Sequence, residues 1–113
     1  MEEFIQCTND KAIYKKILTE GKGTAPKVGQ KVKVKYTGML EEGTKFDESK
    51  EPIVFKLGGG EVVKGWEIGI PTMKKGERSV FVIRYDYAYG EQGYPGLIPP
   101  KSTLIYLLEL IDF

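Results

Sequence analysis

The sequence predicts an α+β domain in which an antiparallel sheet of five or six strands packs against one short α-helix. Short β-branched and aromatic stretches recur along the chain and are separated by glycine-containing turns, as in sheets with antiparallel neighbours. A single stretch, residues 62–70, has helical rather than strand periodicity. A sheet covered by one helix forms two layers that enclose a single core.

The strands are predicted from alternation and side-chain type. Residues 31–36 (KVKVKY) place three lysines on one face and Val32, Val34 and Tyr36 on the other, which is typical of a half-buried strand. Residues 103–111 are apolar on both faces and are expected to form the most buried strand. The first few residues are expected to add an edge strand. Further strands are predicted at residues 13–19, 53–57 and 79–85, with turns at 21–23, 26–29, 42–43 and 75–77.

Residues 62–70 (VVKGWEIGI) are predicted to form a helix of about two turns. Its apolar face is formed by residues at i, i+3 and i+7, namely Val63, Trp66 and Ile70, with Val62 beside them. Pro71 follows at once and is expected to end the helix. Gly65 and Gly69 each weaken the helix by roughly 1 kcal/mol. Because they lie four residues apart, they should leave a bare stripe where another backbone or a ligand can approach closely.

Composition and charge exclude several classes of function. The 113 residues suggest one domain, and 17 basic against 16 acidic residues give a net charge of +1. This balance argues against a nucleic-acid binder that acts through bulk positive charge. No stretch approaches the ~20 apolar residues of a membrane span, and the first ten residues lack the pattern of a signal peptide. We therefore expect a soluble, cytoplasmic protein with no nucleic-acid or membrane partner, and a monomer by default.

The chain also lacks the residues of most nucleophilic and metal chemistry. It has no histidine and a single cysteine, Cys7. Ser-His-Asp and Cys-His catalysis is therefore excluded, as is nearly every zinc or copper site, and no metal or other cofactor is expected. The glycine run at residues 58–65 (GGGEVVKG) resembles a phosphate loop, but it lacks the Gly-Lys-Ser/Thr ending. A flexible turn into the helix is favoured over nucleotide binding.

Aromatic residues indicate an apolar pocket instead. Residues 85–103 (YDYAYGEQGYPGLIPPKST) contain enough glycine and proline to form a loop, yet they carry four tyrosines together with Leu97 and Ile98. Other predicted elements also carry aromatics, namely Tyr36, Phe46, Phe55, Trp66 and Tyr106. Any one of them could simply fill the core. Together they exceed what a thin two-layer core needs, so we expect an aromatic-lined pocket with a few polar groups.

Three segments resemble the FKBP family of peptidyl-prolyl cis-trans isomerases. They are YTGMLEEGTKFD at 36–47, GGGEVVKGWEIGI at 58–70 and DYAYGEQGYPGLIPPKSTLIYLLEL at 86–110, and the similarity covers about residues 14–112. Residues 1–13 would be an N-terminal extension or edge strand of a single domain, 1–113. The resemblance implies a sheet wrapped around a short helix, and a small cytosolic isomerase that accelerates X–Pro rotation and assists protein folding. It also implies binding of proline-containing polypeptides and of the macrolides tacrolimus and rapamycin.

The same resemblance implies a set of site residues. Trp66 would form the floor of a pocket between helix and sheet. The walls would be Tyr36, Phe46, Phe55 and Tyr106, with Val62 and Val63 from the helix entry and Tyr89, Leu97 and Ile98 from the loop. Polar contacts are implied for the side chains of Asp47 and Tyr89, the Val63 N–H and the Glu61 carbonyl. The residues implied to be catalytic are Tyr36, Asp47, Val63, Trp66 and Tyr89.

Three features depart from the family pattern. The segment between Asp47 and the strand at 53–57 is short, so that Lys50 is only a candidate for the basic partner that often accompanies this aspartate. Ile53 stands where an aromatic residue is common, and Tyr94 stands at the loop tip where a histidine is common. We expect the first departure to affect the orientation of Asp47 and the other two to affect rim shape and drug affinity.

Two alternatives to an isomerase are considered. One is an FKBP-like binding module that grips proline-containing partners and for which catalysis is secondary. The other is a nucleotide-binding or other small-ligand domain, which depends on the glycine run alone. The resemblance further implies calcineurin or a target-of-rapamycin kinase as partners bridged by a drug, and the choice between them depends on rim residues 50–53 and 91–95.

Overall fold

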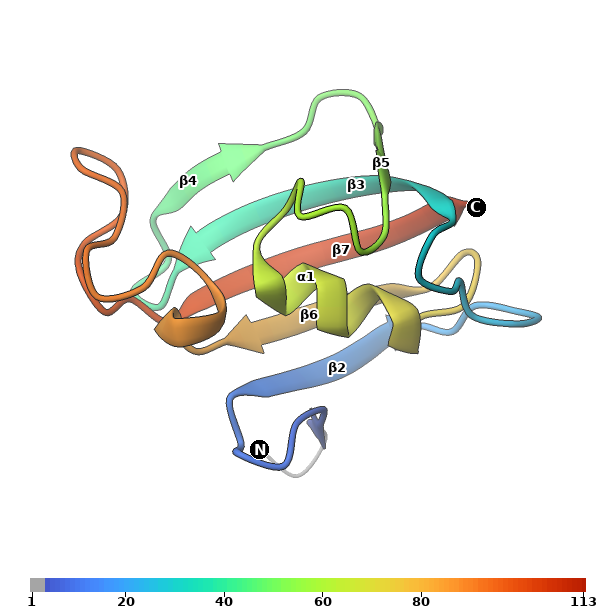
Figure 1. Cartoon of the computed structure of the whole chain (residues 1–113), viewed down its shortest axis with the longest axis horizontal. Helices are drawn as coiled ribbons and strands as arrows, with labels where there is room; N and C mark the ends of the chain where they lie inside the picture. The colour runs from blue at the N-terminus through green and yellow to red at the C-terminus, as the bar shows by residue number, and fades with distance from the viewer. Residues whose placement is uncertain (1–3) are drawn as a thin grey trace.

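The structure, a computed structural model, describes residues 4–113, and these contain one antiparallel sheet of seven strands. The strands are β1 (Ile5–Gln6), β2 (Ile13–Thr19), β3 (Lys31–Leu40), β4 (Lys45–Glu48), β5 (Ile53–Lys56), β6 (Arg78–Ile83) and β7 (Leu104–Asp112). Their order in the sheet is β1-β2-β6-β7-β3-β4, and β5 also pairs with β3. Strand β7 therefore lies between β6 and β3 and joins the two halves of the sheet (Figure 1).

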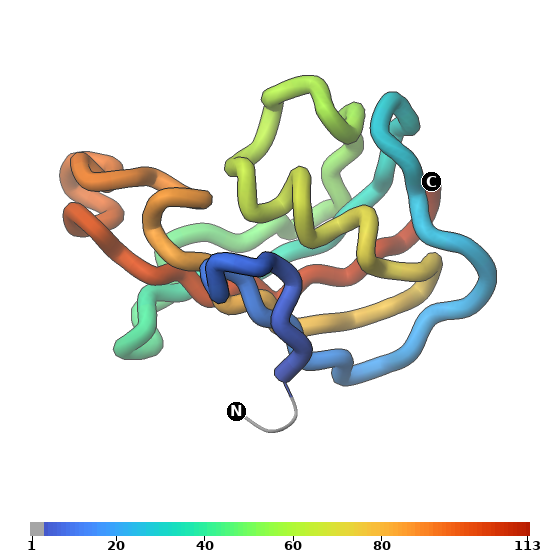
Figure 2. The backbone as a smooth tube through the Cα atoms, turned by 60° about the horizontal axis from the view of Figure 1, so that its bottom comes forward, coloured from blue at the N-terminus to red at the C-terminus, as the bar shows by residue number. Residues whose placement is uncertain are grey.

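Helix α1 (Lys64–Gly69) continues into a 3-10 turn, η1 (Ile70–Thr72), and both lie across one face of the sheet (Figures 1 and 2). The core fills the space between these two layers. Its fully buried side chains come from most strands and from η1, and include Ile13, Val34, Ile70, Phe81, Ile83, Leu104, Leu108 and Leu110. Among residues 4–113, no helix combines the length and the apolar character needed to cross a membrane.

The predicted antiparallel sheet is confirmed, with differences at its edges. Strand β2 has the predicted bounds, and the expected edge strand is β1, which pairs with β2. Strand β3 continues through Leu40, and β6 ends at Ile83, two residues before its predicted end. Strand β4 was not predicted. In β7, buried and partly exposed residues alternate, so one apolar face is buried and the other is only partly covered.

The predicted helix is shorter at its start and continues past Pro71. Val62 and Val63 precede α1, and Val63 is the N-cap residue with an extended backbone (φ −60°, ψ 150°). Pro71 does not end the helical path, which continues through η1 to Thr72. A proline is tolerated in the first turn of a helix because its missing N–H would have no partner there.

The prediction that Gly65 and Gly69 admit a backbone or a ligand is wrong. A Cβ at Gly65 would lie 2.6 Å from a methyl carbon of Ile83, and one at Gly69 would lie 2.7 Å from the ring of Phe81. The glycine stripe therefore faces β6, and side chains of the sheet fill it. Close packing between the two layers requires the absence of a side chain at these two positions.

The loop after β6 begins in a polar cluster that ties it to the N-terminal segment. The Arg84 guanidinium donates to Asp86 at 2.7 Å and to the Asp10 carbonyl at 3.1 Å, and the Tyr87 hydroxyl donates to the Asp10 carboxylate at 2.7 Å. Hydrogen bonds from Thr8 and Tyr87, with the nearby charge of Arg84, lower the pKa of Asp10 to about 2. This cluster fixes the base of the loop that carries Tyr89.

Candidate functional site

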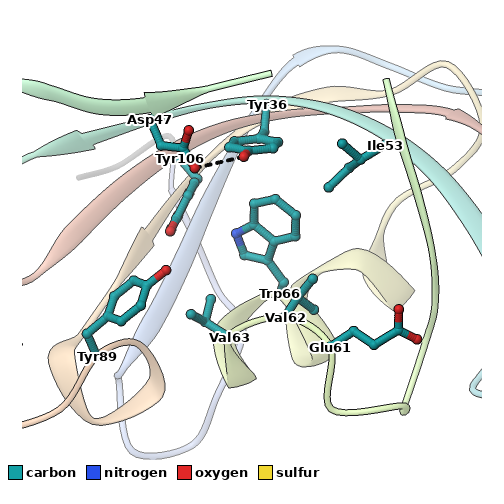
Figure 3. Close-up of a pocket in the computed structure, with 9 residues that line it drawn as sticks. All are labelled: Tyr36, Asp47, Ile53, Glu61, Val62, Val63, Trp66, Tyr89 and Tyr106. Atoms are coloured by element: carbon teal, nitrogen blue, oxygen red, sulfur yellow. Dashed lines mark hydrogen bonds between the residues drawn. The ribbon is translucent and has the colours of Figure 1, made fainter. Parts of the chain in front are cut away.

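A cavity of about 200 Å³ opens between α1 and the sheet, beside the loop that follows β6 (Figure 3). Its lining residues come from β3, β4, β5, β7, the segment before α1, α1 itself and the loop. They are Tyr36, Asp47, Ile53, Glu61, Val62, Val63, Trp66, Tyr89 and Tyr106. These seven parts of the chain meet at the cavity only when the whole sheet, the helix and the loop are folded.

Trp66 forms the floor of the cavity and is only 4% exposed. Its ring centroid lies 5.0 Å from that of Tyr36 and 5.2 Å from that of Tyr106, with both pairs close to perpendicular. The Phe55 ring lies behind it at 5.9 Å. Such edge-to-face contacts favour one orientation of each ring, so the aromatic surface is formed before any ligand arrives.

The indole Nε1 of Trp66 is buried and has no hydrogen-bond partner among residues 4–113. A buried donor without a partner lowers stability by about 1–3 kcal/mol relative to a satisfied one. The floor of the cavity therefore contains one unsatisfied donor.

Tyr36 and Asp47 form the polar side of the cavity. The Tyr36 hydroxyl donates to Asp47 Oδ2 at 2.8 Å, and the Glu48 N–H donates to Asp47 Oδ1, also at 2.8 Å. Burial, together with the hydrogen bond to Asp47, raises the pKa of Tyr36 to about 12. Within residues 4–113, no ion pair joins Asp47 to Lys50, so its orientation is set by Tyr36 and by the adjacent backbone.

Tyr89 and Tyr106 complete the aromatic wall on the loop side. Burial raises the pKa of Tyr106 far above its usual range, with a further contribution from Tyr89. The Tyr89 ring also packs edge-to-face against Tyr94, at 6.0 Å between centroids. Tyr94, which the sequence placed at the loop tip, thus packs against a residue that lines the cavity.

The structure brings together eight of the twelve predicted site residues: Tyr36, Asp47, Glu61, Val62, Val63, Trp66, Tyr89 and Tyr106. Phe46 and Phe55 stand behind the lining, where Phe46 packs against Tyr106 at 5.7 Å and Phe55 packs against Trp66. Leu97 and Ile98 lie outside the lining. Ile98 is buried in the core, and Leu97 is 47% exposed.

Ile53 lines the cavity, although it was not among the predicted site residues. The sequence could have identified Ile53 as a lining residue. It lies two residues from Phe55, so both side chains point to the same face of β5. Among residues 4–113, no group of three or more histidine, cysteine, aspartate or glutamate side chains is arranged to hold a metal ion.

Comparison with known proteins gives one consistent result. The model of the family described as FKBP-type peptidyl-prolyl cis-trans isomerase matches residues 22–111. The chain is 50% identical over 91 residues to the peptidyl-prolyl cis-trans isomerase Fkbp12 of Drosophila melanogaster, which covers 78% of this chain and 84% of that protein. It is 49% identical over 100 residues to the FK506-binding protein 1 of Yarrowia lipolytica, covering 85% and 93% of the two chains.

A solved structure agrees with these sequence relatives. The crystal structure of a peptidyl-prolyl cis-trans isomerase from Pseudomonas syringae superposes with a TM-score of 0.90 at 33% sequence identity. The superposition covers 99% of this chain and 81% of the bacterial one. The likeness therefore extends over the sheet, the helix and the loop around the cavity.

Proposed function

The chain belongs to the FKBP-type peptidyl-prolyl cis-trans isomerase family and accelerates rotation about X–Pro bonds, and we propose that it does so in the cavity over Trp66. The observation that carries this proposal is a buried tryptophan surrounded by three aromatic rings, with Tyr36 and Tyr106 edge-to-face and Phe55 tilted, and with the Tyr36–Asp47 hydrogen bond at the side of the cavity. A proline ring is an apolar group of a size that such a floor can seat. We further propose that residues 1–113 form one domain and act as a monomer.

The chemistry requires neither a nucleophile nor a proton transfer. The barrier to rotation, ~18–20 kcal/mol, arises from amide resonance, which also places partial charges on the oxygen and nitrogen of the planar bond. The twisted transition state has lost this resonance and is less polar. Transfer of the imide from water into an aromatic cavity therefore raises the planar ground state more than the transition state. A rate gain of three to six decades needs about 4–8 kcal/mol.

The lining residues suggest separate roles in binding the proline ring and the imide bond. Trp66 seats the proline ring, and the Val63 N–H holds a carbonyl group of the substrate. The Tyr36 hydroxyl remains protonated at neutral pH and is already bonded to Asp47, so this pair offers a fixed dipole beside the imide. Tyr89 closes the loop side. Desolvation by the rings and hydrogen bonds to the twisted bond then act together.

A matched pair of valine substitutions tests the site. Val63→Phe adds a ring to the lining of the cavity, whereas Val54→Phe adds the same ring on β5, where Val54 is 60% exposed. In a protease-coupled assay with a Leu-Pro peptide, we expect Val63→Phe to lower kcat/KM at least tenfold, which corresponds to about 1.4 kcal/mol of transition-state stabilisation. Val54→Phe should stay within twofold of the wild type. Wild-type kcat/KM in a folded Val63→Phe variant would place catalysis elsewhere.

We also propose that the cavity binds the macrolides tacrolimus and rapamycin, since relatives named for FK506 binding share about half of their residues with this chain. Trp66 is the single tryptophan of the sequence, so a change in intrinsic fluorescence on adding either drug reports this cavity directly. Saturable quenching in the wild type, weakened in Val63→Phe, is the expected result. Drug-bridged capture of calcineurin or a target-of-rapamycin kinase stays a prediction, which a pull-down with each drug tests.

A further inference from the structure

The glycine run before α1, residues 58–60, resembles a phosphate loop in sequence. In the structure it binds the carboxylate of Glu67 from the same chain. Gly58 and Gly60 both have positive φ, +83° and +71°. Their N–H groups converge on Glu67 of α1: Gly58 donates to Oε1 at 2.9 Å and Gly60 donates to Oε2 at 3.1 Å. Successive backbone N–H groups that converge in this way form a concave anion site, called a nest. Here the nest is filled by the Glu67 carboxylate.

The position of this contact in the chain links it to the cavity. Gly60 is followed directly by Glu61, Val62 and Val63, which line the cavity. The far end of this segment is also tied to α1, because the Val63 carbonyl accepts from the N–H groups of Trp66 and Glu67 at 3.0 and 3.3 Å. The lining segment is therefore held at both ends by the first turn of the helix that presents Trp66.

The two ends of the segment are held in different ways. The Val63 end is part of the helix itself and persists as long as the helix is formed. On the strand side, the turn is anchored by Leu57, whose N–H donates to the Gln30 carbonyl at 2.9 Å. The tip between these anchors, Gly58 to Gly60, is drawn toward the helix by Glu67. Within the tip, the Gly59 N–H donates to the Lys56 carbonyl at 3.2 Å, and Glu67 is the side chain that ties the tip to the helix.

We infer that Glu67 is a positioning residue: its carboxylate, bound in the Gly58–Gly60 nest, fixes the 61–63 segment against Trp66 and so sets the geometry of the cavity. This inference rests on the proposed function of the cavity. A carboxylate suits the nest because both of its oxygens accept hydrogen bonds, whereas an amide has one acceptor and would turn N–H donors toward the second glycine N–H. Glutamine at this position should therefore lose the clamp although its shape is nearly the same.

The experiment compares Glu67→Gln and Glu67→Ala with Glu42→Gln, a change at an exposed turn far from the nest. We expect kcat/KM for a Leu-Pro peptide to fall about tenfold in both Glu67 variants, since small displacements of positioning groups have effects of this order. The Glu42 variant should remain at the wild-type value. Circular dichroism at the assay temperature confirms that each variant is folded.

Added formate separates positioning from a general loss of stability. In Glu67→Ala the nest is empty, so millimolar formate should occupy it and restore part of kcat/KM, whereas in Glu67→Gln the amide blocks the nest and formate should have no effect. Chloride at the same ionic strength is the control for salt. Amide hydrogen exchange should show Gly58 and Gly60 deprotected in both variants and protected again by formate in Glu67→Ala.

The possible results can be told apart. Wild-type kcat/KM in both Glu67 variants, with Gly58 and Gly60 deprotected, would overturn the positioning role. Reduced activity that formate does not change in Glu67→Ala would also overturn it. If Val63→Phe retained full activity, the proposed site would fail instead, and amide exchange at the two glycines would still decide whether Glu67 holds the turn.

Discussion

The two ends of the helical segment differ in how completely the protein satisfies its own buried groups. Beyond η1, the Lys15 ammonium donates to Glu77 at 2.8 Å and to the Thr72 carbonyl at 2.9 Å, and the Ser79 hydroxyl donates to Glu77 at 2.7 Å. The Lys15 and Glu77 side chains are only 6% and 4% exposed. At the start of α1, by contrast, a cavity remains open and the Trp66 indole N–H has no partner within residues 4–113.

This difference separates stability from binding within one small core. We call the region beyond η1, around Lys15 and Glu77, the closed end, and the cavity at the start of α1 the open end. At the closed end, each charged group has its partners inside the protein, and removal of one partner leaves a buried charge. At the open end, aromatic rings line a cavity and one buried donor has no partner within residues 4–113, so part of this region contributes to binding rather than to stability. We therefore expect substitutions at the closed end to change the free energy of unfolding and those at the open end to change kcat/KM.

The largest effect is expected from Glu77→Ala at the closed end. The change leaves Lys15 buried without its carboxylate, so we expect the free energy of unfolding to fall by about 3–5 kcal/mol. Urea denaturation measures this value, and kcat/KM at a temperature where the variant is folded should stay within twofold. Glu77→Gln retains the shape of the side chain, so its free energy of unfolding should lie between those of the wild type and Glu77→Ala. A loss under 1 kcal/mol in both variants would show that the closed end is not the main source of stability.

A smaller effect is expected where the helix meets β6. Gly69→Ala should gain about 1 kcal/mol of helix propensity but lose about 1–3 kcal/mol through overpacking against Phe81. The net result should be a loss of about 1 kcal/mol in the free energy of unfolding. Combining it with Phe81→Leu tests the cause, because the double variant should be more stable than the sum of the two single changes indicates. Strict additivity would mean that the two side chains do not compete for space.

The smallest effect is expected at the open end, in alkaline solution. The folded pKa of Tyr36 is about 12, whereas an unfolded tyrosine titrates near 10. The protonated Tyr36 hydroxyl therefore contributes to the free energy of unfolding in full below pH ~10, and this contribution is lost as the pH rises toward ~12. Asp47→Asn should lower this pKa, while the part caused by burial remains. A titration followed by NMR of the tyrosine ring carbons measures the shift, and an unchanged pKa would show that Asp47 does not act on Tyr36.

The sequence predicted the elements whose pattern is local. Strand β3 alternates because one face is buried, and Trp66 was assigned to the inner face of the helix from spacing alone. Strand β4 has mostly exposed, polar residues, and it is a strand because Gly38 and Thr37 of β3 pair with it. No local signal reveals such a partner.

The two predicted site residues that lie outside the cavity lining show a similar limit of sequence reasoning. Leu97 and Ile98 are apolar residues in a loop, and apolar character does not say whether a side chain turns toward the cavity, the core or water. The contact of Glu67 with the glycine run was likewise beyond sequence reasoning, because it depends on how the turn folds back onto the helix. The resemblance identified the other lining residues because it supplied three-dimensional information that spacing lacks.

The central position of β7 has a consequence for how the molecule is made. Without residues 104–112, the sheet consists of two separate pieces, β1-β2-β6 and β4-β3-β5. During synthesis on the ribosome, the two pieces cannot join until β7 has emerged, because β7 pairs with both of them. Until then, β6 and β3 each have an unpaired strand edge. Much of the pairing in this sheet links strands distant in sequence, a topology that folds slowly. An enzyme that speeds proline-limited folding would thus itself have to fold after translation of its sheet is complete.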